Sequence, residues 1–462
     1  MHPPPCAAVL AGLVAAGCHS YSPDPVDLEA HAEAFAERVP DGTALREFVE
    51  RLRSSDPTVQ PFDLADGLDR QEARCVALLF HPELRTMRLR AHVASAGAEH
   101  AGLWDDPELS VDFAKILESV AHPWVVGGAI GITLPITGRP GLARELADSR
   151  HGHALVEARV AEARVLRDLD LQWARWSAAR LAAEELGALV ERLTELEAVA
   201  ARLAAAQLIT NVEARAFRLE RTVREVQLVR ARAAVSADEI HLKQLLGLPP
   251  DRVVGFVPAI DLPLHVADAA QRRTGLTDGP RTALARAEHE VADREFALAI
   301  RKQWPELTVL PGFQEEDAQP RAALGFSLPL PLWNRNARQV AETRAERARA
   351  AEALRGSVEI ALQNLALAEV RHDAARNQRQ LVETQLLPLA EQQLADGRRL
   401  VDLGKLDTLL ILDALTRSHD AATQALDAAL AEAEAIVDIN SLFWPTLTMG
   451  NSTGGNPTEA GR

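Results

Sequence analysis

The chain has 462 residues, of which 25 % are charged and only 4 % are aromatic, and its formal net charge is −16. This acidic balance argues against a nucleic-acid partner, which requires a basic surface. A single Tyr, together with abundant Ala, Leu, Glu and Arg, favours long helices and coiled coils over a thick globular core.

The N-terminus predicts an export signal over residues 1–17. Its apolar run, residues 6–17, is too short to cross a membrane as a helix and has the length of a signal-peptide core. The run ends in Val14-Ala-Ala-Gly-Cys18, which resembles the lipobox of bacterial lipoproteins and implies acylation of Cys18. Residues 1–5 lack Lys and Arg, so an unmodified signal peptide or a disordered leader is the alternative.

After the signal, residues 18–62 are interpreted as a lipidated tether and an equatorial segment that contains short helices. We expect a helix from Asp63 to Phe80, because His81-Pro82 interrupts the apolar pattern there. A second helix is expected from Pro82 to about Leu103.

The rest of the chain consists of two copies of one unit, expected at 63–246 and 280–444 and joined by an equatorial linker at 247–279. Pro82 and Pro280 are 198 residues apart, and so are Pro107 and Pro305. Further anchors occur in the same order: Leu134-Pro135 with Leu328-Pro329, and Leu208, Thr210 and Val212 with Leu406, Thr408 and Leu410. Residues 445–462 are expected to be a disordered tail.

Each copy begins with a predicted pair of strands, at about 109–134 and 307–328. Large apolar residues alternate there with small or polar ones, as in Leu324-Gly-Phe-Ser-Leu328. The strands are long enough to cross a bilayer when tilted, but four strands cannot close a barrel within one chain. The alternative is a four-stranded sheet packed on a soluble domain.

Each copy continues into a long helical hairpin, predicted at about 142–246 and 337–442. Leu186, Leu189, Leu193 and Leu196, followed by Val199 or Ala200, recur at spacings of three and four, which indicates a coiled-coil seam. The outgoing helix of about 60 residues would extend roughly 90 Å. Pro388 should kink or interrupt the outgoing helix of the second copy.

Taken together, these features resemble the TolC-type outer-membrane efflux factors, over about residues 63–444. With the lipobox, the chain resembles most the lipoprotein channels of tripartite efflux pumps. The stretches that carry the resemblance are His81-Pro-Glu-Leu-Arg85, Thr133-Leu-Pro-Ile-Thr-Gly-Arg139, Ser327-Leu-Pro-Leu-Pro-Leu-Trp-Asn-Arg335 and Leu403-Gly-Lys-Leu-Asp-Thr-Leu-Leu-Ile-Leu-Asp413.

The resemblance implies a fold that is mainly α with a small β part. Each chain would contribute four strands to a trimeric, twelve-stranded transmembrane β-barrel and its helices to a tunnel across the periplasm. It also implies a homotrimer in the outer membrane of a Gram-negative bacterium, in contact with lipid. The expected function is a passive exit channel for small molecules or ions, supplied by a periplasmic adaptor and an inner-membrane efflux transporter. The sequence does not identify the cargo.

The same resemblance assigns roles at the tip of the second hairpin. Asp413 falls where the family often places an aspartate of the periplasmic aperture, and Asp402 and Asp407 are further candidates near the turn. The alternative is that these are ordinary solvated carboxylates, with Asp407 as a helix N-cap. Adaptor docking is expected at the tip residues Gly404, Lys405 and Leu406.

The sequence contains no pattern that predicts catalysis, a cofactor or a metal site. His151 and His153 are two residues apart, so a helix does not place them on one face. No phosphate-binding Gly-Lys-Ser/Thr loop and no Gly-x-Ser-x-Gly motif occurs. The remaining alternative to a channel is a periplasmic coiled-coil scaffold or adaptor, although an adaptor normally has one helical hairpin rather than two.

Overall fold

The computed structural model describes residues 21–40, 42–55, 61–117, 124–316, 319–402 and 408–445. The chain divides into two compact units, Met1–Val39 and Pro40–Arg462. In the first unit, helix α2 spans Leu28–Ala36, and the Asp27 side chain caps it by accepting hydrogen bonds from two backbone N–H groups. All the other helices and strands of the described residues belong to the second unit.

The second unit begins with α3 (Thr43–Ser55), α4 (Arg70–Phe80) and α5 (Pro82–Glu99). The prediction of a helix from Asp63 was wrong, because α4 is capped at Asp69. The Asp69 carboxylate accepts a 2.8 Å hydrogen bond from the Glu72 N–H, and the Glu72 carboxylate accepts one of 3.0 Å from the Asp69 N–H. This reciprocal capping box fixes the helix start and leaves 63–69 non-helical. The predicted break at His81-Pro82 is confirmed.

The four predicted strands form one antiparallel sheet in the order β1-β2-β3-β4. Their bounds are Glu108–Lys115, Trp124–Leu134, Leu307–Glu316 and Gln319–Ser327. Strands β1 and β2 come from the first copy of the repeat, and β3 and β4 from the second. The β2–β3 pair therefore joins the two copies through backbone hydrogen bonds.

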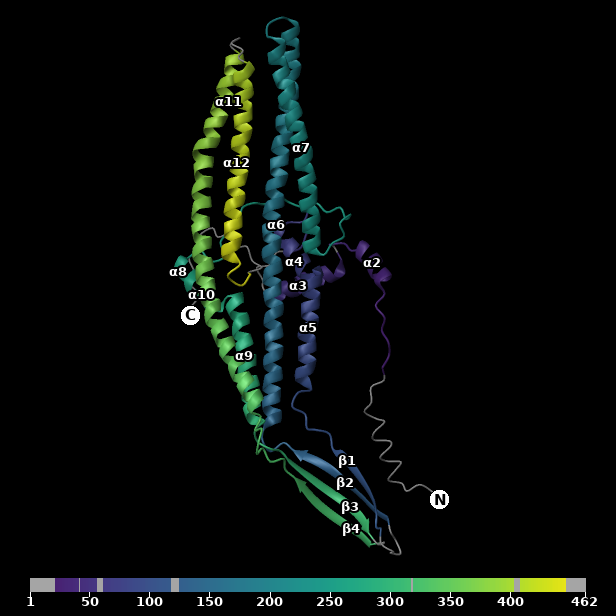
Figure 1. Cartoon of the computed structure of the whole chain (residues 1–462). Helices are drawn as coiled ribbons and strands as arrows, with labels where there is room; N and C mark the ends of the chain where they lie inside the picture. Colours follow the sequence, from purple (N-terminus) through teal and green to yellow (C-terminus); the bar gives the residue numbers. More distant parts are fainter. Residues whose placement is uncertain are drawn as a thin grey trace, which may run out of the picture. The chain divides into compact units, whose positions relative to one another are not determined.

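Two long helical hairpins lie side by side, with their tips at the end opposite the sheet (Figure 1). The first consists of α6 (Arg139–Ala205) and α7 (Asn211–Leu246). The second consists of α10 (Ala337–Leu381), the π-helical segment η2 (Val382–Leu386), α11 (Leu387–Asp402) and α12 (Thr408–Asn440).

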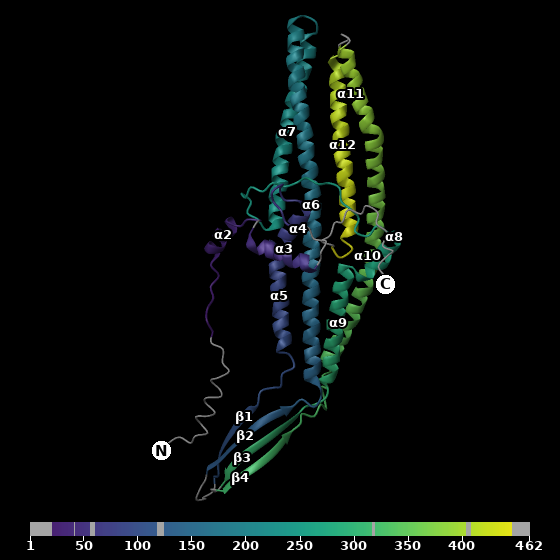
Figure 2. The same ribbon diagram turned by 180° about the vertical axis from the view of Figure 1, so that it is seen from behind.

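Shorter elements surround the sheet-proximal half and the middle of these hairpins. Helix α5 packs on α6, and α9 (Pro280–Arg301) packs on both α6 and α10. Helix α8 (Ala269–Gly275) and the short η1 (Leu276–Asp278) belong to the segment that connects the copies. From behind, α3 and α4 lie beside the middle of α6 (Figure 2).

The predicted coiled-coil seam is present and is made of Leu and Ala. Leu189 and Leu193 are buried on α6, where they pack with Phe217 of α7. Of the two candidates for the next position, Ala200 is 3 % exposed and Val199 is 39 % exposed. The seam therefore continues through the small residue, which lets the two helix backbones approach closely.

Pro388 interrupts its helix as predicted. Its ring removes a backbone N–H and would clash with the carbonyl of the residue four positions earlier, Thr384. The helix adapts by widening into the π-helical segment η2 just before the proline.

The first hairpin turns without a glycine. Ala206, which corresponds to Gly404 in the second copy, has φ −81°, and the left-handed residue is Gln207 at φ 60°. The Leu208 N–H donates to the Leu203 carbonyl at 2.9 Å, and the Gln207 N–H donates to the Ala204 carbonyl at 3.0 Å. These two bonds form a Schellman motif that ends α6. The following helix begins with a capping box between Thr210 and Glu213.

In the described part of the chain, no helix is both long enough and apolar enough to cross a membrane.

A glycine at the end of α7 determines how the linker meets α4. Gly247 has φ 65°, and a Cβ atom there would lie 2.5 Å from the carbonyl oxygen of Phe80. We expect Gly247→Ala to destabilise the protein by about 2 kcal/mol or more, because the left-handed conformation alone costs roughly 1 kcal/mol with a Cβ. The loss of helical circular dichroism on heating measures the effect.

The matched control is Gly187→Ala, inside α6, where no atom beyond the adjacent backbone of the helix itself lies within 4 Å of the added Cβ. It should be neutral or stabilise the helix by up to about 1 kcal/mol. Equal melting temperatures for the two variants would contradict the steric argument.

Candidate functional site

One face of the sheet is a continuous apolar surface. In the β1–β2 pair, Leu109 lies opposite Ile130 and Phe113 lies opposite Val126. Because directly paired residues point to the same side, the alternation found along each strand produces one apolar face across all four. Its large side chains are 36–72 % exposed: Leu109, Val111, Phe113, Trp124, Val126, Ile130, Ile132, Phe313, Leu324 and Phe326.

The opposite face carries small and polar side chains. Thr133 and Thr308 form a 3.0 Å hydrogen bond between β2 and β3, and the Ser110 hydroxyl donates to the Ala129 carbonyl. The other members of this face include Asp112, Gly127, Gly131, Gly312, Gln314, Arg321, Ala323 and Gly325. The sheet therefore separates an apolar surface from a hydrophilic one, with no side-chain layer of the described chain covering the former.

The sheet is open at both edges. Within the described residues, β1 pairs with β2 alone and β4 pairs with β3 alone. Each edge strand thus presents a row of backbone N–H and C=O groups without a ladder partner. A sheet with an exposed apolar face and two open edges is incomplete as a single chain.

At the tip of the second hairpin, the structure describes only part of the predicted site. Asp413 lies on the exposed face of α12, and its Oδ2 accepts a 2.7 Å hydrogen bond from Arg417 Nε one turn later. The same exposed face continues through Asp420, Gln424 and Asp427. Asp402 is the last residue of α11, and its side chain is outside the description. The remaining predicted sites lie outside the described residues: Cys18, Gly404, Lys405, Leu406 and Asp407.

The linker is fixed to the middle of the helices by aromatic and polar contacts. Phe256 packs edge-on against Trp173 and Trp176 of α6, with ring centroids 5.5 and 5.6 Å apart. The Nε1–H of Trp173 donates a hydrogen bond to the Val257 carbonyl. The side-chain oxygen of Asn440, on α12, accepts a 2.9 Å hydrogen bond from the His265 backbone N–H and so connects α12 to the linker. We call this junction of α4, α6, α12 and the linker the equatorial belt.

The equatorial belt contains buried charges. Arg70 and Arg74 lie one turn apart on α4 and are 8 % and 1 % exposed. Asp170 of α6 accepts a 3.0 Å hydrogen bond from Arg70 Nη1, while Arg74 Nε lies 3.9 Å from the same carboxylate oxygen. The Asp170 carboxylate therefore lies near two guanidinium groups, but it accepts a hydrogen bond only from that of Arg70.

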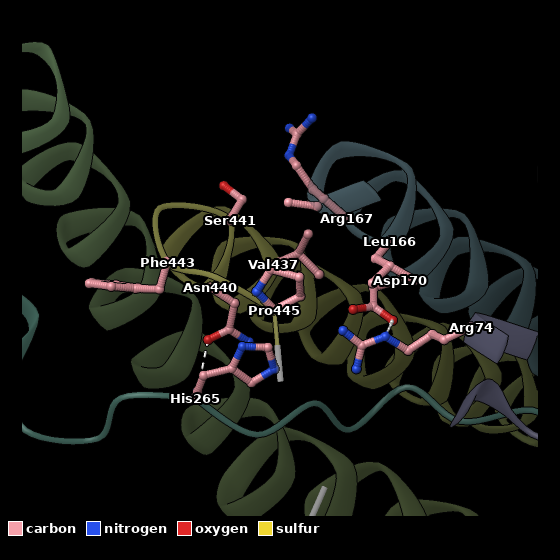
Figure 3. Close-up of a pocket in the computed structure, with 11 residues that line it drawn as sticks. Arg74, Leu166, Arg167, Asp170, His265, Val437, Asn440, Ser441, Phe443 and Pro445 are labelled. Carbon is pink, nitrogen blue, oxygen red and sulfur yellow. Dashed lines mark hydrogen bonds and ion pairs between the residues drawn. The ribbon is translucent and has the colours of Figure 1, made fainter. Parts of the chain in front are cut away.

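A cavity of about 20 Å³ adjoins these charges, and Arg74, Asp170, His265 and Asn440 are among its lining residues (Figure 3). Burial and the neighbouring Arg74 guanidinium lower the pKa of His265 to about 4. The imidazole is therefore neutral at pH 7. In the described part of the chain, no group of three or more His, Cys, Asp or Glu residues is placed to hold a metal ion.

Solved structures of similar fold were found, although no protein-family model and no curated protein sequence matches the chain. The outer-membrane channel OprN superposes with a TM-score of 0.68 at 16 % identity, over 93 % of this chain and 99 % of that one. CusC, whose structures concern folding and transmembrane channel formation, superposes with a TM-score of 0.68 at 15 % sequence identity. The match covers 82 % of this chain and 93 % of that one. VceC, an outer-membrane protein of Vibrio cholerae, superposes with a TM-score of 0.65 at 19 % sequence identity, over 81 % of this chain and 95 % of that one.

The chain has the fold of TolC-type outer-membrane channels. The prediction of a mainly helical fold with two repeats and four strands is thereby confirmed. The structural neighbours are channels and outer-membrane proteins rather than enzymes.

The sequence reasoning missed the buried charges of the equatorial belt. The signal was present in α4, where Arg70 and Arg74 share a helix face with the buried Ala73 and Ala77. Arginine at two successive positions of an apolar face indicates a buried ionic network. Its partners Asp170 and His265 could not be found in this way, because they are about 100 and 190 residues away in the sequence.

The lowered pKa of His265 predicts an acid-dependent loss of stability. The folded-state value of about 4 lies below the ordinary 6.5, so between these pH values the unfolded chain binds more protons. The free energy of unfolding should therefore fall as the pH is lowered from 6.5 to 4, by about 2 kcal/mol per chain after allowance for partial exposure. Chemical denaturation of the purified protein across this range, in halide-free buffer so that no small anion lies beside the imidazole, measures it.

Carboxylates titrate in the same pH range. The comparison that isolates His265 is therefore the difference in the pH dependence of the unfolding free energy between the unmodified protein and His265→Gln. This variant should lose part of the pH dependence, whereas His100→Gln, at an exposed position, should keep it. Parallel pH profiles for all three proteins would show that His265 is not the titrating group.

Proposed function

We propose that this chain is the outer-membrane channel of a tripartite efflux system, in which three copies form one continuous conduit. The observation that carries the proposal is the exposed apolar sheet face bounded by two open edges. In water such a face would be an aggregation hazard, but in a bilayer it is in contact with lipid tails.

The open edges support assembly from several chains. In lipid an unpaired strand edge costs several kcal/mol for each unsatisfied backbone group. If β1 of one chain pairs with β4 of the next, every ladder is completed and the sheet closes on itself. Three chains of four strands give a twelve-stranded barrel with the apolar face outward and the face of Ser110, Asp112 and Gln314 toward the lumen.

The helical hairpins would extend the conduit into the periplasm. The exposed polar stripe of α12, from Asp413 to Asp427, is suited to a water-filled tunnel. In this proposal Asp413, with Asp402 and Asp407, lies near the periplasmic aperture. Gly404, Lys405 and Leu406 at the tip contact a periplasmic adaptor, which couples the channel to an inner-membrane transporter.

The N-terminus would anchor the chain to the same membrane through an acylated Cys18. Residues 1–17 would be removed on export, and 18–62 would connect the lipid anchor to the equatorial belt. A coiled-coil scaffold or adaptor is the less favoured function, because neither requires ten large apolar side chains exposed on one face of a sheet.

Placing a charge on the apolar face tests the membrane-spanning role. We expect Val111→Arg to reduce trimeric protein in the outer membrane at least about tenfold, since Arg at the lipid midplane costs about 2–4 kcal/mol per strand. Quantitative blotting of outer-membrane fractions after cross-linking measures the trimer.

The control is Asp112→Arg, which introduces the same side chain one position along β1 on the polar face. It should assemble as well as the unmodified protein. Equal loss in both variants, or normal trimer in Val111→Arg, would refute lipid exposure of this face.

Removing the Asp413 carboxylate tests its place at the aperture. A charge about 10 Å from a pore ion contributes about 0.4 kcal/mol in water, so three equivalent carboxylates alter cation occupancy several-fold. We therefore expect Asp413→Asn to lower the cation preference of single channels in planar bilayers. Glu195→Gln, which removes a carboxylate from an exposed position of α6, should leave it unchanged. Identical ion selectivity in both variants would place Asp413 outside the conduction path.

A further inference from the structure

The equatorial belt contains a buried cation that lacks a hydrogen-bond partner. The Nε and Nη1 atoms of Arg74 are buried without a partner among the described residues, although the residue is only 1 % exposed. Burial lowers the pKa of this guanidinium, but an Arg side chain remains charged at any physiological pH. A buried charge without hydrogen bonds is costly, so the site calls for an acceptor.

Asp170 does not meet this need. Its Oδ1 accepts the hydrogen bond from Arg70 and lies 3.9 Å from Arg74 Nε, beyond hydrogen-bond distance. Arg167 also lines the cavity, but it is paired with Asp168 at 3.1 Å and with Asp438 at 3.5 Å. Asp170 therefore accepts no hydrogen bond from Arg74, whose Nε and Nη1 atoms remain without an acceptor among the described residues.

The opposite wall of the cavity carries a second set of polar atoms without partners. Both ring nitrogens of His265 are buried and have no hydrogen-bond partner among the described residues. Figure 3 shows the His265 imidazole and the Arg74 guanidinium extending into the pocket from opposite sides. Asn440 is already engaged, because its Oδ1 accepts from the His265 backbone N–H and its Nδ2 donates to the Pro263 carbonyl.

We propose that this cavity binds one small monovalent anion, of the size and chemistry of chloride, between Arg74 and His265. The guanidinium donates to the ion from Nη1, while its Nε–H stays directed at Asp170. The neutral imidazole donates from one ring N–H, and the negative charge of the ion offsets that of the buried Arg74. The volume of about 20 Å³ exceeds the roughly 10–15 Å³ that one water molecule needs, so the cavity accommodates one monatomic ion.

An anion here would connect the two copies of the repeat. Arg74 belongs to α4, His265 to the linker, and the wall is completed by Val437 and Asn440 of α12. The ion would thus hold together segments that are separated by up to 366 residues in the sequence, from Arg74 to Asn440. This role is independent of cargo and of the membrane-spanning sheet.

Two measurements on the full-length protein in detergent test the proposal. In the first, the ³⁵Cl NMR line width is followed during chloride titration at constant ionic strength, with gluconate as the replacing anion. We expect saturable, protein-dependent broadening that is lost in Arg74→Met and reversed by bromide. Arg175→Met is the matched control, because Arg175 lies on α6 in an exposed pair with Glu434; it should retain the broadening.

In the second measurement, crystals of the unmodified protein are grown in bromide and the anomalous signal is recorded at the bromine edge. A peak in the cavity beside Arg74 and His265 supports the proposal, even if Arg74→Met fails to fold. Density there without anomalous signal identifies a water molecule and overturns it, as does broadening that is absent or unaffected by Arg74→Met in a folded variant. Bromide peaks confined to other positions would also refute it, as adventitious ions only.

Discussion

The structure depends above all on where the backbone hydrogen bonds of its edge strands are made. Strands β1 and β4 each leave one row of backbone N–H and C=O groups without a neighbouring strand in the described chain. Soluble proteins protect such edges with charges, prolines or a covering helix. Here the edges border a surface of large apolar side chains, so water is an unsuitable environment for the sheet and an open sheet is unsuitable for lipid. Association between chains resolves both conflicts at once.

In the helical part, the geometry is set by how Leu and Ala side chains pack between neighbouring helices. The seams between long helices use Leu with many Ala. Ala200 rather than Val199 is buried after Leu196, as the alternating spacing of three and four residues requires. Rigidity in the middle comes from the equatorial belt, where aromatic rings and buried ions fix the linker to α4, α6 and α12. The belt is the place where the chain most resembles an ordinary globular core.

Much of this architecture could be predicted from the sequence, because repetition and periodicity are properties of local segments. The alternation of large and small residues in Leu324–Leu328 was sufficient to predict a strand. The Leu spacing from Leu186 onward was sufficient to predict the coiled-coil seam. The start of α4 was misplaced because the capping box at Asp69 and Glu72 outweighs the helical propensity of the residues before it.

The equatorial belt could not be predicted, since Arg74, Asp170 and His265 meet only through tertiary packing. The tip of the second hairpin remains a prediction in large part, because Gly404 and its neighbours lie outside the described residues.

The outgoing helices of the two hairpins have nearly equal lengths. The outgoing helix of the first hairpin, α6, has 67 residues, and α10, η2 and α11 together have 45, 5 and 16, which gives 66. At about 1.5 Å per residue, the two outgoing helices agree in length to within a few ångströms. The tip of α6 and α7 nevertheless lies farther from the sheet than the described ends of α11 and α12 (Figures 1 and 2). In the proposed trimer, six hairpin ends of two alternating kinds would therefore form a stepped rim, and a partner in the periplasm would meet two distinct sets of three ends.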